Sequence, residues 1–135
     1  MKPGDIFLSN VANFSPGSPV GNHLYAVLSN PADAKEGRQL LVVVTISSYE
    51  TYKEDTCQLT SSDHHKISHP SVVEYRYTQY VPAERILQLQ QDKNITFYEP
   101  LEQSVLHRIL QGALQSRKIP DKYIQFLDRQ GLFGD

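Results

Sequence analysis

Apolar positions in the first half of the chain fall in short runs of the kind that form β-strands. The run over residues 39–48 (QLLVVVTISS) is the most apolar, and its β-branched residues are typical of a strand buried on both faces. Residues 71–81 alternate instead, with Val73, Tyr75 and Tyr77 on one side, which predicts a half-buried strand. Shorter strands are expected over residues 5–9, 23–29, 55–59 and 95–98.

Two polar segments interrupt these strands. Residues 10–22 hold two Pro and two Gly among Ser and Asn, which predicts a long loop, and loops of that length in a compact domain are often functional. Residues 60–70 form a second predicted loop, which carries three histidines.

The spacing of apolar residues changes in the second half of the chain. Between residues 101 and 117 the apolar side chains recur at helical spacing, after Pro100 and before Pro120. A short last helix is predicted over residues 121–130, with Gly131 past its end. The pattern predicts an α+β, mainly-β fold: a small, bent antiparallel barrel over about residues 4–99, followed by a C-terminal helical part over about residues 100–130.

Composition limits the classes of function. A chain of 135 residues fits one domain, here residues 1–135, and its single cysteine excludes an internal disulfide. The lack of a disulfide favours a cytoplasmic protein. We also expect no membrane segment, because no stretch is apolar enough to span a bilayer. The formal net charge of −2 argues against non-specific coating of nucleic acid, but it allows a local cationic site.

The segment Asp63-His64-His65-x3-His69 places four residues that could act as acid, base or ligand within one loop. Asp63 could orient a histidine for proton transfer. Alternatively, Asp63 caps a turn and the histidines are solvated. A zinc site with Cys57 is a third interpretation, but the paired ligand spacings of structural zinc are incomplete. We therefore expect no metal or other cofactor, and a lone cysteine is more often a small buried apolar residue.

Four segments, in this order, resemble the PemK/MazF-like toxin family. They are the early Gly4-Asp5-Ile6, the stretch HLYAVLS at 23–29, the stretch VVVTISS at 42–48, and the stretch DHHKISHPSVV at 63–73. The second and third are similar to the family's Arg-Pro-x-x-Val-Leu-Ser and Val-Pro-Ile-Thr-Ser strands. The fourth is similar to an Asp-His loop before a Ser-x-Val strand in a PemK-like subgroup. The resemblance covers roughly residues 4 to 115.

The resemblance implies an SH3-like barrel, usually a homodimer, that acts as the toxin of a type II toxin-antitoxin system. Such a protein would cleave single-stranded RNA without a metal ion and would be neutralised by an antitoxin protein. The family's Arg falls on His23 and its Thr on Ser47. Because His lacks the fixed charge and forked donors of Arg, the alternative is a non-catalytic barrel that binds a protein or nucleic acid.

Metal-independent RNA cleavage needs a base for the 2′-OH, a donor for the charged phosphorane and an acid for the departing 5′-oxygen. The predicted catalytic residues are His23, Ser47, His64, His69 and Arg76. Arg76 would supply a cation; the competing interpretation is an exposed pair with Glu74 on one strand face. We expect His23 and at least one loop histidine to meet at the open end of the barrel, beside residues 10–22.

Overall fold

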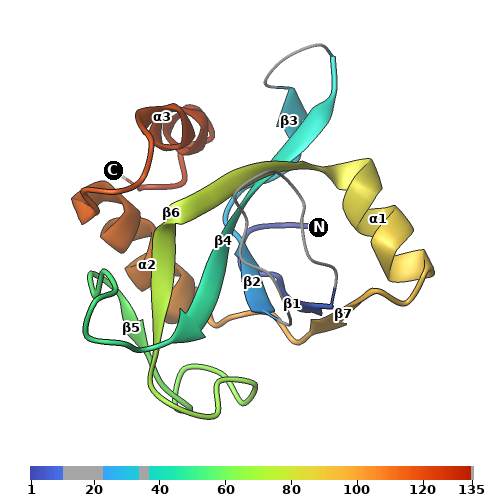
Figure 1. Ribbon diagram of the computed structural model, residues 1–135. Coiled ribbons are helices and arrows are strands. Elements are labelled where there is room, and N and C mark those ends of the chain that lie inside the picture. The colour runs from blue at the N-terminus through green and yellow to red at the C-terminus, as the bar shows by residue number, and fades with distance from the viewer. Residues whose placement is uncertain (11–22, 34–36, 135) are drawn as a thin grey trace.

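The computed structural model describes residues 1–10, 23–33 and 37–134, so almost all of the predicted loop over 10–22 lies outside the described residues. Its strands form one antiparallel sheet in the order β5-β6-β4-β2-β1-β7, and a short strand β3 pairs with β4 (Figure 1). The strand bounds are β1 Ile6–Ser9, β2 His23–Val27, β3 Ala32–Asp33, β4 Gln39–Ser48, β5 Gln58–Leu59, β6 Ser71–Pro82 and β7 Ile95–Tyr98. The helices are α1 Ala83–Gln91, α2 Gln103–Gln115 and α3 Asp121–Arg129.

The sheet curls into a half-barrel, with α2 and α3 on one side and α1 on the other (Figure 1). This confirms the predicted mainly-β antiparallel fold with a C-terminal helix. Among the described residues, no pairing joins the outer strands β5 and β7, so the barrel is open. None of the three helices is long and apolar enough to cross a membrane, within the part of the chain that the structure describes.

Strand β4 divides the interior into two cores. Its side chains Val42, Val44 and Ile46 belong to a cluster that includes α2 and α3, whereas Leu41 and Val43 belong to a second cluster with α1. The prediction of a strand buried on both faces is therefore confirmed. Burial of apolar area on both faces is the main stabilising contribution to such a strand.

Strand β6 departs from the predicted alternation. Val43 pairs with Gln79 and Thr45 with Glu74, so β6 contributes extra residues opposite Val44 and forms an irregular bulge. The strand therefore does not keep the predicted alternation of buried and exposed side chains. Tyr77 is only half-buried, whereas Glu74 is buried. The interpretation of Glu74 and Arg76 as an exposed pair is therefore wrong for Glu74.

The helical part agrees with the sequence pattern, with one addition. α2 and α3 lie within the predicted helical ranges, and Gly131 follows α3 with a φ of 69°. The helix α1 was not predicted; it begins after Pro82 and buries Ile86 and Leu89 against the second core.

Candidate functional site

A cavity of about 380 Å³ opens at the end of the sheet where β2 begins and β4 ends. Its walls come from strands β1, β2, β4, β6 and β7, from the loop over residues 60–70 and from the connection between β4 and β5. The lining residues are Leu8, His23, Leu24, Ile46, Ser47, Ser48, Lys53, Lys66, Ile67, Ser68, His69, Ser71 and Tyr98. Three of the five predicted catalytic residues, His23, Ser47 and His69, are thus brought together in one cavity.

His69 is held by two serine hydroxyls. Its Nε2 lies 2.6 Å from Ser48 Oγ and its Nδ1 lies 3.0 Å from Ser68 Oγ. Hydroxyls can donate or accept, so they can support either tautomer of the ring. These contacts hold the ring at the cavity wall, and either ring nitrogen can act as hydrogen-bond donor or acceptor.

Lys53 is fixed at the end of β4 beside the same cavity. Its Nζ donates to Ser47 Oγ at 3.1 Å and to the backbone oxygen of Ser48 at 2.8 Å. The Ser47 hydroxyl in turn donates to a carboxylate oxygen of Glu74 at 2.8 Å. Ser47 therefore connects a buried carboxylate to a lysine cation.

The cavity is locally cationic although the whole chain has a net charge of −2. The described residues that line it include the cations Lys53 and Lys66 but no Asp or Glu. The Nζ of Lys66 lies 4.4 Å from the ring centroid of Tyr98. Clefts lined by one sign of charge concentrate ligands of the opposite sign, so this cavity favours an anion such as a phosphodiester.

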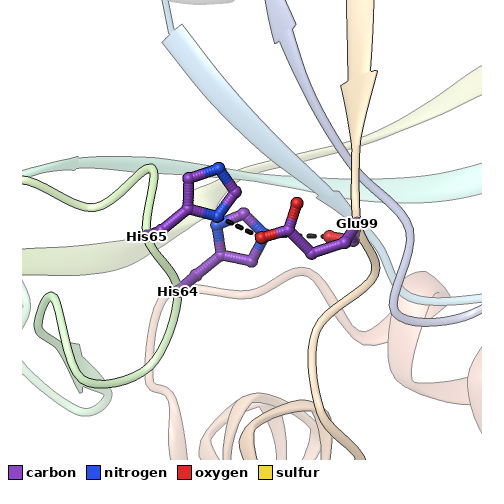
Figure 2. Close-up of side chains that lie close together, drawn as sticks. All are labelled: His64, His65 and Glu99. Carbon is purple, nitrogen blue, oxygen red and sulfur yellow. Dashed lines mark hydrogen bonds and ion pairs between the residues drawn. The ribbon is translucent and has the colours of Figure 1, made fainter.

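His64 does not line the cavity. Its side chain is buried, 3% exposed, and its Nε2 donates to the backbone oxygen of Glu99 at 2.8 Å (Figure 2). Its Nδ1 accepts the backbone N–H of Lys66 at 3.1 Å, which fixes the tautomer with the proton on Nε2. His64 therefore joins the loop over residues 60–70 to the end of β7, and the alternative that this histidine is solvated is wrong.

His64, His65 and Glu99 also bring three potential ligand atoms within 4.8 Å of one another (Figure 2). A metal on His64 Nε2 would remove the proton that donates to Glu99, while the Lys66 N–H still points at Nδ1. A neutral ring would then carry its proton on Nδ1 and lose the Lys66 hydrogen bond as well. A metal here would therefore cost both hydrogen bonds that fix His64. Cys57, the other suggested ligand, is buried in the core, as predicted for a small apolar side chain.

Glu99 instead forms an ion pair with His65. A hydrogen bond from its own backbone N–H and the neighbouring His65 lower the pKa of the Glu99 carboxyl.

Asp63 does not orient a histidine. It accepts the backbone N–H of Thr60 at 2.8 Å and forms an ion pair with Arg108 at 2.7 Å. Burial would raise the pKa of Asp63, but the hydrogen bonds from Arg108 and Thr60 outweigh it and lower the pKa. Among the described residues, the hydrogen-bond and ion-pair partners of Asp63 are Thr60 and Arg108, not a histidine, which agrees with the turn-capping alternative.

Arg76 is exposed on β6 and does not line the cavity. Its guanidinium lies 4.6 Å from the ring centroid of Tyr77, and it borders a separate small crevice with Lys53 and Lys118. The cations of the cavity, Lys53 and Lys66, were missed in the sequence. Lys66 lies within the histidine loop, a local signal that could have identified it; Lys53 carried no comparable signal.

The fold and the cavity define this protein as a mainly-β half-barrel with a cationic, histidine-bearing cavity at one end of its sheet. Comparison with models of known protein families and with curated proteins gives no match for the chain.

Proposed function

We propose that this protein is a metal-independent endoribonuclease that cleaves single-stranded RNA in the cavity at the end of β4. The observation that carries the proposal is that His23 and His69 share this cavity with Lys53 and Lys66. Two histidines can divide proton transfer between a base and an acid, and lysines can stabilise a charged phosphorane.

The chemistry is a transesterification. One histidine accepts the proton of the ribose 2′-OH, and the 2′-oxygen forms a bond to the adjacent phosphorus. The P–O5′ bond breaks, and the other histidine gives a proton to the departing 5′-oxygen. The products are a 2′,3′-cyclic phosphate and a 5′-hydroxyl, so atoms and charges balance without a metal ion. Lys53 and Lys66 offset the negative charge on the phosphate oxygens.

The test is cleavage of a labelled single-stranded RNA in the presence of EDTA. We expect His23→Ala and His69→Ala each to reduce the rate by roughly two to four orders of magnitude. His107→Ala is the matched control, because His107 is exposed on α2 and outside the cavity. DNA of the same sequence should stay intact, since it lacks the 2′-OH. Full activity of the folded His23→Ala and His69→Ala proteins, or loss of activity in EDTA, would contradict the mechanism.

The biological role as a toxin rests on the resemblance to the PemK/MazF-like family. Inducible expression should arrest growth and cut transcripts, and unaffected growth at verified protein levels would contradict the role. The partner antitoxin and the homodimer have the same basis, and light scattering at micromolar concentration tests the dimer. If the protein binds RNA but never cleaves it, the non-catalytic barrel replaces the enzyme; His23 and Ser47 at the family's Arg and Thr positions motivate that alternative.

A further inference from the structure

Two exposed tyrosines lie on the segment that carries Lys53. Among the described residues, the large apolar side chains that are exposed are Tyr49, Tyr52, Leu87 and Leu114. Tyr52 is 74% exposed and Tyr49 is 39% exposed, and both belong to the connection between β4 and β5. Half of these exposed side chains are therefore aromatic rings within a few residues of the cavity.

This connection is tied to the cavity wall on both sides of the tyrosines. Tyr49 directly follows Ser48, and its backbone N–H donates to the oxygen of Pro70 at 3.0 Å, next to His69. Lys53, which directly follows Tyr52, reaches back to the Ser48 oxygen at 2.8 Å, and its Nζ lies 6.0 Å from the Tyr52 ring. The chain on either side of the two rings is thus anchored next to the cavity, and Tyr52 lies beside a fixed cation.

The surface beyond Tyr52 continues with further cations. Tyr52 and Lys53 border the small crevice that also contains Arg76 and Lys118. The crevice also contains the carboxylates of Glu54 and Glu74, which accept hydroxyl hydrogen bonds and keep their negative charge, so three cations outnumber two anions there. An aromatic ring between cations is the arrangement that proteins use to bind single strands, with bases on the rings and phosphates on the charges.

We propose that Tyr49 and Tyr52 stack on unpaired bases next to the phosphate that enters the cavity, while Lys53 contacts the backbone between them. The ligand class is single-stranded nucleic acid. This inference rests on the proposed function, because it assigns the nucleotides that flank the scissile bond. It also explains how a protein of net negative charge would select single strands: a duplex keeps its bases stacked on one another and offers no free base face to the rings.

The probe is a fluorescent 2′-O-methyl RNA, which is single-stranded and cannot be cleaved, and the readout is fluorescence anisotropy. Loss of one stacking ring is expected to weaken binding roughly 5- to 100-fold, so Tyr52→Ala and Tyr49→Ala should each raise Kd by that factor. Tyr52→Phe and Tyr49→Phe keep the ring and should bind nearly as wild type. Leu87→Ala is the matched control, because Leu87 is 50% exposed on α1.

The outcomes separate this inference from the proposed function. Tight binding that needs both rings supports the inference even if unmodified RNA is never cut. Cleavage by the wild type with unchanged Kd and rate in both alanine variants overturns the inference and leaves the endoribonuclease intact. Absence of both binding and cleavage overturns both. A Kd for the duplex equal to that of the single strand would also overturn the stacking inference.

Discussion

Replacing His64 with alanine should destabilise the protein more than any other single histidine substitution in the loop over residues 60–70. The ring is buried, and it makes two hydrogen bonds, to the Glu99 oxygen and from the Lys66 N–H. Each bond contributes roughly 0.5–1.5 kcal/mol net, and removal of a buried ring adds the loss of its packing. We expect the free energy of unfolding to fall by about 2–4 kcal/mol.

Urea unfolding followed by circular dichroism measures this change, with the m-value held constant to show that only stability differs. His65→Ala is the control, since the His65 side chain is 54% exposed and pairs with Glu99 at the surface, and it should cost less than about 1 kcal/mol. His64→Gln can keep the donor to the Glu99 oxygen but not the acceptor for the Lys66 N–H. Its loss in free energy of unfolding should therefore lie between those of His64→Ala and His65→Ala. Equal effects for His64→Ala and His65→Ala would refute the role of His64 as the tie between the loop and β7.

Three other substitutions follow from the core and the loop. Gly112→Ala should cost about 1–3 kcal/mol, because a Cβ there would overlap the buried Tyr75 hydroxyl, and urea unfolding should show a smaller cost in a Tyr75→Phe background. A cost independent of residue 75 would disprove the clash. Asp63→Asn should cost about 1–2 kcal/mol at neutral pH, because the Asp63 carboxylate pairs with Arg108. The folded-state pKa of Asp63 is lowered, so its contribution is present above the unfolded pKa of about 4 and is lost as pH falls through the folded pKa. Unfolding curves between pH 7 and pH 2 should therefore converge for the wild type and Asp63→Asn, and a pH-independent gap would contradict this. Arg108→Ala should show the same pH dependence, since it removes the same ion pair.

The sequence predicted elements whose signal is local. The β-branched run of β4 and the helical spacing in α2 repeat over ten or more residues, and both elements appear where expected. The helix α1 was missed because it is short and buries only Ile86 and Leu89, so its period gives little signal. The bulge in β6 depends on pairing with β4, which no pattern within 71–81 reveals.

Most of the cavity depends on contacts between distant parts of the chain. Ser47 and Glu74 are 27 residues apart, and His64 and Glu99 are 35 apart. Four residues of the loop over 60–70 could act as acid, base or ligand, and the sequence does not distinguish them. In the fold, Asp63 forms an ion pair with Arg108, His64 is buried and His69 lines the cavity. Their different roles follow from burial and partners, which local spacing does not specify.

His23 and Ser47 line the same cavity. The predicted resemblance to the PemK/MazF-like family sets His23 at an Arg position and Ser47 at a Thr position. A histidine cannot supply a permanent charge, but Lys53 and Lys66 line the same cavity. Lysine binds phosphate as a point charge without the planar fork of Arg, so phosphate placement would depend more on how firmly each lysine is held. The Glu74–Ser47–Lys53 chain provides that hold for one lysine. Under the proposed function, Ser47 would therefore place the lysine cation, and His23 would transfer protons.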